Sequence, residues 1–376
     1  MINFFAPINN LGIGTHAYNL MKAYAGRHSD DDTSLIPPLG NIAIKNEQTQ
    51  KWLTNPFNRD NPSIMIFQPS FMSQFSGTPM IGYPVFEMKT FTPRELDYLR
   101  ACDYLIVPSQ WGKAVLDSYN DMPQVLVVPE GYDPLIYYPD NTIAFKVKRI
   151  EDNGVTFVTV GKFEERKGTK DVIECFDQGT AGKRANLIAH VHNPFDQKWF
   201  FRIAALIMSL GYEKEPAGES FTYFVKDKQR IIIPMGPVET NKDMASFYRR
   251  ADFGLFMSKA EGWNLPLLEC IASGTPAITT DWTGMSDFVN EHYPQEIKIK
   301  TKGDEIANDG VWFKGDRGEW TIPDKDHATS IIKDLMEDTG KYLLLTEKCV
   351  NAVKDFTWDK AAEKLDEVLC LARGKE

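Results

Sequence analysis

The stretch Phe253-Gly-Leu-Phe-Met-Ser-Lys-Ala-Glu-Gly-Trp-Asn-Leu-Pro-Leu-Leu-Glu269 indicates a buried strand, a turn and a helix in succession. Its first four residues, Phe253–Phe256, form a short continuous apolar run, typical of a strand buried on both faces of a parallel sheet. Pro266 stands in the first turn of the predicted helix, Leu267–Ala272, where its missing N–H costs nothing. A strand followed at once by a helix is one unit of a βαβ architecture.

The same alternation of apolar runs and helical patterns extends over the whole chain and predicts an α/β protein with parallel sheets. The predicted strands of the first half are Met1–Pro7, Ile64–Phe67, Met80–Tyr83, Tyr104–Val107 and Val125–Val128. Those of the second half are Val155–Val160, Asn186–His190, Ile231–Ile233, Phe253–Phe256 and Ala277–Thr279. We therefore expect two doubly wound, Rossmann-like domains that face each other across a cleft, with ligands outside the carboxyl ends of their strands.

The boundary between the domains is predicted in Tyr138–Asn153, a polar stretch that reads as a linker. This gives a first domain over residues 1–145 and a second over 146–355, followed by a tail, 356–376, with a helical apolar pattern. A chain of 376 residues is long enough for two hydrophobic cores.

Composition narrows the class of protein. Hydrophobic residues make up 43% and charged residues 25%, as in a soluble enzyme, and no apolar run is long enough to cross a membrane. The amino terminus lacks the basic start of a signal peptide. Five cysteines without CxxC spacing fit a reducing cytoplasm. The net charge is −10, and residues 1–150 hold 12 basic and 14 acidic side chains, so neither half has the basic excess that duplex nucleic acid requires.

Two glutamates, Glu261 and Glu269, frame the turn after Phe253–Phe256. Free backbone N–H groups at the start of the following helix would face an anion, which the helix dipole favours. Glu269, one turn into that helix, offers an acceptor-only carboxylate suited to paired sugar hydroxyls. The spacing of the two glutamates alone is equally consistent with a purely structural strand, turn and helix that carries two solvated acids.

Six motifs, in order along the chain, resemble those of glycosyltransferase family 4. They are Asn10-Leu-Gly-Ile-Gly-Thr-His16, Pro129-Glu-Gly-Tyr-Asp133, Val160-Gly-Lys-Phe-Glu-Glu-Arg-Lys-Gly168, the E-x7-E element Glu261–Glu269, Ala272-Ser-Gly-Thr-Pro-Ala-Ile-Thr-Thr280 and Phe356-Thr-Trp-Asp-Lys-Ala-Ala362. The resemblance covers nearly the whole chain and implies that the tail, 356–376, returns to the first domain as a helix. It implies the GT-B fold and a retaining, metal-independent hexosyltransferase that moves a sugar from a nucleotide-diphosphate sugar to an acceptor hydroxyl.

The resemblance also implies a role for each matched position. Lys162 and Lys167 would bind the donor diphosphate and stabilise the charge of the leaving group, so that neither a metal nor a cofactor is expected. Glu261 would contact the transferred sugar, and Glu269 would accept hydrogen bonds from the ribose hydroxyls. The remaining predicted donor-binding positions are Gly12, Gly14, Thr15, Gly161, Trp263, Asn264 and Leu265.

Three positions depart from the family pattern. Asn264 stands where the family usually has Gly, and Asn tolerates a left-handed backbone well, so the turn is expected to survive. Lys162 replaces the more usual Arg and loses its planar fork for phosphate. Glu87 follows the strand after which many relatives have a His. We predict Glu87 on the acceptor or sugar side, together with His16 and His190.

Three further features are interpreted as structural or left open. Ser109 is predicted to cap the helix that follows it. Asp30–Asp32 reads as a solvated loop rather than a metal site. His190 and His192 alternate on a predicted strand and could line the cleft or bind a metal, and no acid or Cys at ligand spacing supports the metal.

The sequence thus predicts a cytoplasmic glycosyltransferase, with peripheral attachment to a membrane left open. Its donor would be a UDP- or GDP-sugar, and its acceptor a glycan, a lipid, a protein or a modified nucleic-acid base. Alternatives of the same class are a GT-B phosphorylase and a nucleotide-sugar epimerase. A nucleotide-sugar-binding protein that has lost catalysis is the alternative of a different class.

Overall fold

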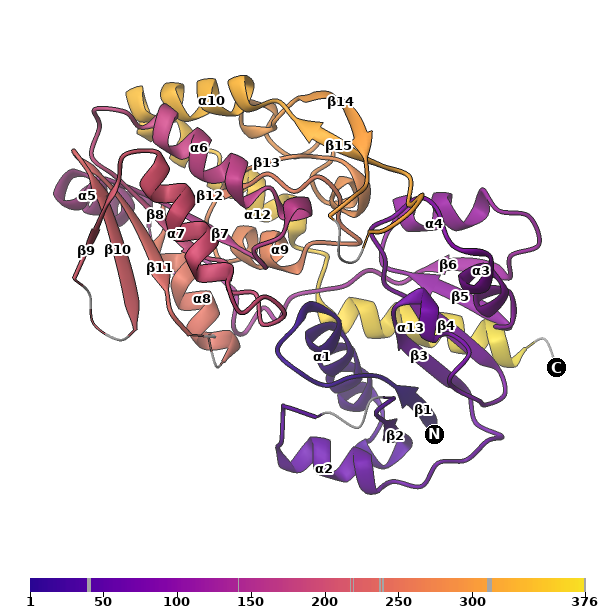
Figure 1. Ribbon diagram of the computed structural model, residues 1–376. Coiled ribbons are helices and arrows are strands. Elements are labelled where there is room, and N and C mark those ends of the chain that lie inside the picture. Colours follow the sequence, from indigo (N-terminus) through magenta and orange to yellow (C-terminus); the bar gives the residue numbers. More distant parts are fainter. Residues whose placement is uncertain are drawn as a thin grey trace. The chain divides into compact units, whose positions relative to one another are not determined.

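The chain divides into two compact units, each described here by itself. The computed structural model describes residues 1–38, 42–140, 142–216, 218, 220–236, 238, 240–309 and 313–374. Unit 1 comprises Met1–Tyr132, Glu261–Leu265 and the chain from Asp355, and unit 2 comprises Asp133–Ala260 and Pro266–Lys354. Both are α/β units built on a largely parallel sheet (Figure 1).

Unit 1 contains a six-stranded parallel sheet in the order β2-β1-β3-β4-β5-β6. The strands are β1 Ile2–Phe5, β2 Thr33–Ile36, β3 Ser63–Phe67, β4 Met80–Pro84, β5 Tyr104–Val107 and β6 Gln124–Val127. The helices are α1 Gly12–Arg27, η1 Asp30–Asp32, α2 Glu47–Thr54, η2 Pro69–Phe71, α3 Pro93–Arg100, α4 Gln110–Asp117 and α13 Trp358–Arg373. The strand order reverses between β1 and β3, so the carboxyl ends of these two strands are the expected ligand-binding edge.

Unit 2 contains a seven-stranded sheet in the order β13-β12-β7-β8-β11-β10-β9. Its neighbouring strands are parallel except in two pairs, β11 with β10 and β10 with β9, which are antiparallel. Its strands are β7 Val155–Val160, β8 Ala185–His190, β9 Glu213–Glu215, β10 Phe221–Lys226, β11 Gln229–Pro234, β12 Phe253–Phe256 and β13 Ala277–Thr279. A separate antiparallel pair is formed by β14 Thr301–Ile306 and β15 Glu319–Pro323. In this sheet the order reverses between β7 and β12.

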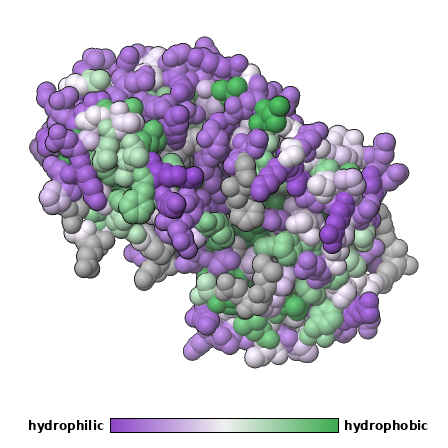
Figure 2. Space-filling view, in the orientation of Figure 1, coloured by the Kyte–Doolittle hydropathy of each residue, from purple (hydrophilic) through white to green (hydrophobic). Residues whose placement is uncertain are grey.

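The helices of unit 2 surround this sheet (Figure 1). They are α5 Ile143–Asn153, η3 Glu165–Lys167, α6 Thr169–Gly179, α7 Trp199–Ser209, α8 Asn241–Arg250, α9 Leu265–Ala272, η4 Thr283–Asp287, η5 Gln295–Ile297, α10 Lys325–Glu337, α11 Thr339–Leu343 and α12 Thr346–Val353. Figure 2 shows a mostly hydrophilic surface with an apolar patch in the part of unit 2 where α7 runs, and Phe201 and Met208 of that helix are exposed.

The tail forms α13, which belongs to unit 1 and packs against α1. Thr357 caps the helix by accepting a hydrogen bond from Lys360 N. Three apolar residues of the predicted stripe, Leu365, Val368 and Leu369, are buried. Leu371, the fourth, is 39% exposed, and Ala372 is buried instead, because a position six residues from Leu365 has turned away from the packed face.

The predicted linker is corrected by the structure. Unit 2 already begins at Asp133, and Ile143–Asn153 within the predicted linker is helix α5, capped by Thr142. Two cations of α5 contact other segments of unit 2. Lys146 Nζ donates to Gly274 O at 2.6 Å, and Arg149 pairs with the buried carboxylate of Asp252. Buried partners for these charges were not visible in the local polar pattern.

Two structural interpretations have different outcomes. Ser109 caps α4 as predicted, because its Oγ accepts a hydrogen bond from Gly112 N at 3.1 Å. The solvated loop predicted at Asp30–Asp32 is confirmed for the side chains of Asp31 and Asp32, which are 76% and 51% exposed, but its backbone and Asp30 differ from the prediction. This segment is the 3-10 helix η1, and Asp30 Oδ1 accepts from Gln48 Nε2 and Trp52 Nε1, each at 2.9 Å. Asp30 therefore holds α2 in place.

Each predicted strand is present, and the unpredicted ones are β2, β9, β10, β14 and β15. Among the described residues, no helix has both the length and the apolar character needed to cross a bilayer.

Candidate functional site

Two loops meet at the switch point of unit 2, because β7 and β12 are neighbouring parallel strands. The loop after β7 runs from Gly161 to Gly168, and the loop after β12 begins at Met257. Arg166 Nη1 donates to Ala260 O, and Lys259 N donates back to Arg166 O, both at 2.7 Å. These reciprocal bonds hold the two loops together.

Gly168 shows how closely the loops approach. Its φ of 64° is left-handed, and a Cβ at this position would lie 2.1 Å from the carbonyl oxygen of Met257. Only glycine combines that backbone angle with so close an approach. The glycine of the motif therefore serves to seat the loop after β7 against the end of β12.

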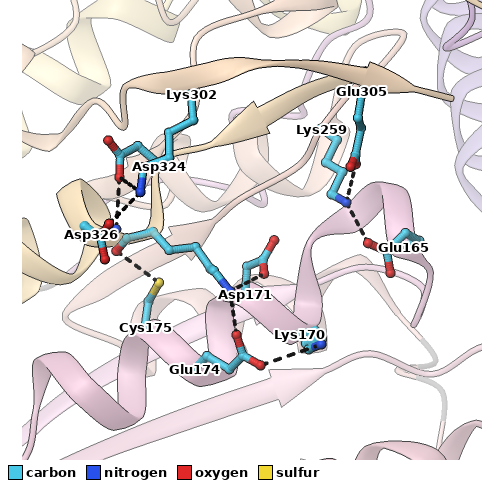
Figure 3. Close-up of polar contacts among 11 residues, drawn as sticks. Glu165, Lys170, Asp171, Glu174, Cys175, Lys259, Lys302, Glu305, Asp324 and Asp326 are labelled. Atoms are coloured by element: carbon cyan, nitrogen blue, oxygen red, sulfur yellow. Dashed lines mark hydrogen bonds and ion pairs between the residues drawn. The ribbon is translucent and has the colours of Figure 1, made fainter. Parts of the chain in front are cut away.

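Lys259 joins the same loops to the β14–β15 pair (Figure 3). Its buried Nζ lies 2.6 Å from Glu165 Oε1 in η3 and 2.6 Å from Glu305 Oε1 in β14. Burial lowers the pKa of the Lys259 ammonium, but hydrogen bonds to the two carboxylates outweigh burial and hold that pKa above its ordinary value. Thr321 N of β15 donates to Lys259 O at 3.2 Å.

A second group of ion pairs in Figure 3 stabilises helices rather than these loops. Lys325, the first residue of α10, places Nζ 2.8 Å from Glu174 Oε2 and 3.5 Å from Asp171 Oδ1, both on α6. Lys302 of β14 pairs with Asp324, which caps α10. This group therefore links α6, α10 and β14.

The two lysines of the predicted diphosphate site lie in the loop after β7. Lys162 Nζ is 2.7 Å from Glu164 Oε1 and 5.4 Å from the centre of the Phe195 ring, and its side chain is 32% exposed. Lys167 is half-buried at the end of η3, with its stem beside Gly161, since a Cβ there would lie 3.5 Å from Lys167 Cδ. The structure thus brings Gly161 and Lys167 together and pairs Lys162 with Glu164.

Glu269 lies buried on α9 beside two tyrosines that sequence reasoning missed. Burial raises the pKa of both phenols, Tyr137 and Tyr248, and the nearby charge of Glu269 raises it further. Their rings lie 6.3 Å apart. Tyr137 precedes α5 and Tyr248 belongs to α8, so no local motif connects them with Glu269.

The turn Glu261–Leu265 groups with unit 1 and is buried throughout. A Cβ at Gly262 would lie 2.9 Å from Phe86 O, and the ring of Trp263 lies 5.3 Å from that of Phe356. Asn264 has a φ of 86°, which confirms the prediction that Asn can take the left-handed position in which the family has Gly.

The glycine-rich segment of unit 1 lies at the carboxyl end of β1, where α1 begins. A Cβ at Gly14 would lie 2.3 Å from Asn9 Oδ1, so this glycine permits close contact with the preceding loop. Gly12 is exposed and borders open space, and Thr15 is half-buried in the first turn of α1. Glu87 is half-buried after β4, at the same edge of the sheet.

His16 lies inside unit 1, with 1% of its surface exposed. Its Nδ1 is 3.3 Å from Glu130 Oε1, and its ring lies 4.5 Å from that of Tyr83 and is stacked on Trp358 at 5.8 Å. The ring therefore joins α1, β4 and α13, and this burial favours a structural role. A contact between His16 and a sugar or acceptor stays a prediction.

His190 and His192 have separate partners. His190, at the end of β8, has Nε2 3.3 Å from Gly236 O, and burial lowers the pKa of its imidazole. His192 packs edge-on against Trp199 at 5.3 Å. In the described parts of the chain, no three His, Cys, Asp or Glu side chains gather as a metal would require.

The matches with known proteins agree with this arrangement. Residues 140–311 match the family model described as glycosyl transferases group 1. Except for the turn 261–265, these residues belong to unit 2, so the similarity to that family lies in this unit. This similarity supports the glycosyltransferase class that the sequence predicts.

One curated relative and two solved structures extend the comparison. Mannosylfructose-phosphate synthase of Agrobacterium fabrum is 25% identical over 209 residues, and the match spans 53% of this chain and 42% of that protein. Sucrose-phosphate synthase from Thermosynechococcus elongatus superposes with a TM-score of 0.68 and 14% identity, over 100% of this chain and 99% of that one. The Anabaena protein HepE, solved in complex with UDP-glucose, gives 0.65 and 12%, over 98% of each. The fold is GT-B, as predicted.

Proposed function

We propose that this chain is a retaining, metal-independent glycosyltransferase that moves a sugar from a nucleotide-diphosphate sugar to an acceptor hydroxyl. The observation that carries the proposal is the loop after β7, in which Lys167 and Lys162 lie at the switch point of the unit 2 sheet. Ligands of doubly wound sheets bind at such points, beyond the carboxyl ends of the strands.

The two lysines supply the electrostatics of the transfer. As the bond between the sugar and the diphosphate breaks, negative charge grows on the leaving diphosphate, and fixed cations beside it lower the barrier. Lys167 is held by η3, whose position against the end of β12 is fixed by Gly168 and by the hydrogen bonds that Arg166 makes with Ala260 and Lys259. A cation that is held before the donor arrives needs little reorganisation during the reaction, which is the work that a metal ion would otherwise do.

The bond changes follow a front-face displacement. The acceptor oxygen forms its bond to the anomeric carbon on the face that the diphosphate leaves, and the proton of the acceptor hydroxyl passes to a departing phosphate oxygen. The products are the glycoside, with its configuration retained, and the nucleoside diphosphate. Glu261 is proposed to contact the transferred sugar, Glu269 the ribose hydroxyls, and Glu87 the sugar or acceptor.

The proposed donor is a UDP- or GDP-sugar. HepE, which shares the fold, was solved in complex with UDP-glucose, and this favours trying the uridine sugars first. For the acceptor, a glycan, a lipid, a protein and a modified nucleic-acid base are all compatible with the site. A cytoplasmic location is part of the proposal, since the five cysteines are free and four of them are buried.

A panel of UDP- and GDP-sugars tests the proposal without knowledge of the acceptor. Each is scored for release of nucleoside diphosphate and for thermal stabilisation of the protein. We expect one sugar nucleotide to stabilise the chain and to be hydrolysed slowly. Stabilisation without turnover, even in the presence of an acceptor panel, would indicate a protein that has lost catalysis. Release of a sugar phosphate only after inorganic phosphate is added would indicate a phosphorylase, and either result contradicts the proposal.

A further inference from the structure

A second concave site lies in unit 2, at the amino ends of its parallel strands. It encloses about 640 Å³, which is within the range of pockets for small ligands. Its lining includes Arg184 directly before β8, Lys228 directly before β11 and Asn153 at the end of α5. The loop with Lys167 follows the carboxyl end of β7. A strand of this length spans about 20 Å, so the two sites lie at opposite edges of one sheet.

The floor of this groove follows from strand register. Thr156, Asn186 and Arg230 are paired neighbours on β7, β8 and β11, and Val225 of β10 pairs with Arg230. One step of two residues further, Ile188 pairs with Ile232. Because side chains two residues apart share a face of a sheet, these two rows lie on one face.

The two rows differ in polarity. Asn186 Nδ2 lies 3.4 Å from Thr156 Oγ1 in the first row, and the second row is aliphatic. The residues that alternate with these rows along the strands point to the opposite face, as Gln229 does, whose Nε2 donates to Asp177 O of α6. The groove therefore has an apolar strip beside a row of hydrogen-bonding groups.

The lining of the groove contains four cations. They are Arg184, Lys228, Arg230 and Arg250, and Asp227 is the one carboxylate among the described residues of the lining. This excess of positive charge stands out in a chain with a net charge of −10. Buried charge nearby is neutralised, since Arg149 pairs with Asp252. In contrast, Lys228 and Arg250 make no ion pair with any described residue, and Arg184 donates only to Asp152 O.

We propose that this groove binds a small phosphate ester, at a site separate from that of the sugar donor. Arginine guanidinium groups bind phosphate oxygens through paired hydrogen bonds, and the lining supplies two of them, Arg230 and Arg250. The amide of Asn186 and the aliphatic residues Ile188 and Ile232 offer a hydrogen-bonding and an apolar surface to the organic part of the ester. The ester is a sugar phosphate or a nucleoside monophosphate, which share the phosphate group that the cations select.

Calorimetric titration with inorganic phosphate, at constant ionic strength, tests the proposal with three double variants. Arg230→Gln with Arg250→Gln removes two cations of the groove. Lys162→Gln with Lys167→Gln removes two cations of the loop after β7, called the donor loop below because it carries the proposed diphosphate site. The control is Lys333→Gln with Lys348→Gln, which makes the same charge change in unit 2 on exposed positions of α10 and α12. Thermal melting of each variant checks that the fold is kept.

The expected result is a phosphate-binding event that weakens at least about tenfold in the groove variant, as expected for lost charge-assisted hydrogen bonds, and persists in the other two. Glucose 6-phosphate and uridine monophosphate then compete for the same event, and the stronger competitor identifies the organic part. The proposal is overturned if phosphate binding is lost in the donor-loop variant and kept in the groove variant. Absence of phosphate binding at millimolar concentration, or competition by an oligonucleotide alone, would overturn it equally.

Discussion

Replacing Lys259 by Met tests whether the loop Gly161–Gly168, which carries the proposed donor lysines, depends on ion pairs that lie outside the proposed donor contacts. The side chain keeps its length and burial but loses the ammonium that lies 2.6 Å from both Glu165 and Glu305. Lys259 is not proposed to touch the donor. Its loss should nevertheless loosen η3, which carries Lys167, because Glu165 lies in the same turn.

The exposure of the two carboxylates determines how much stability Lys259→Met should lose. A hydrogen bond between charged groups contributes about 1.5–3 kcal/mol when both partners are dry. Here the carboxylates are partly exposed, 56% for Glu165 and 38% for Glu305, and regain water once the lysine is gone. We therefore expect a loss of about 1–2 kcal/mol in the free energy of unfolding, well below the cost of an uncompensated buried charge. The effect on donor affinity should be larger than such a modest destabilisation explains.

The assay combines urea unfolding with steady-state kinetics for the donor. Lys259→Met should raise the KM for the sugar nucleotide about tenfold, and Lys259→Arg, which keeps the charge, should restore most of it. Lys325→Met is the matched control, because it breaks the paired contacts with Asp171 and Glu174 away from the donor loop. It should leave donor KM unchanged. Equal donor KM values for Lys259→Met and the wild type would refute the view that this lysine supports η3.

Three further perturbations test the fold and its electrostatics. Gly168→Ala should lower the free energy of unfolding in urea by at least about 2 kcal/mol more than Gly182→Ala does. Both glycines have a left-handed backbone, but only a Cβ at position 168 meets a carbonyl oxygen. Equal losses in the two variants would exclude this clash. Trp358→Ala should cost about 3–5 kcal/mol by calorimetry, against less than about 1 kcal/mol for the more exposed Leu371→Ala. Burial lowers the pKa of Lys146 from 10.5 to about 8, so the unfolded chain binds more protons between these values and wild-type stability should rise with pH across that window. Relative to Lys146→Met, the gain should approach about 3 kcal/mol, and a difference that does not vary with pH would contradict it.

The sequence predicted the strands that are buried on both faces, and it missed those that are exposed. Continuous apolar runs such as Val155–Val160 mark interior strands, because every side chain must be apolar when helices cover both faces. β9 consists of exposed charged residues, and β14 is mostly exposed, so neither carries such a signal. α5 was read as a linker because its buried lysine and arginine find partners more than 100 residues away.

Part of the site could also be predicted and part could not. The motifs located both loops at the switch point of unit 2, and the left-handed backbone of Asn264 followed from its residue type. The sequence did not indicate the roles of Arg166 and Lys259, because their hydrogen bonds to Ala260 and Glu165 join residues 94 positions apart in the chain. The burial of His16 likewise depends on Trp358, which approaches it from the far end of the sequence.

The central claim is that lysines of the loop after β7, rather than a metal ion, stabilise the leaving diphosphate. The most direct measurement is the rate of sugar-nucleotide turnover in excess EDTA, for the wild type and for Lys167→Ala. We expect the wild-type rate to be unchanged by EDTA and the variant to be slower by at least about a hundredfold, the usual cost of losing one preorganised charge. Loss of wild-type activity in EDTA with recovery on adding magnesium or manganese, or near-normal turnover by Lys167→Ala, would contradict the claim.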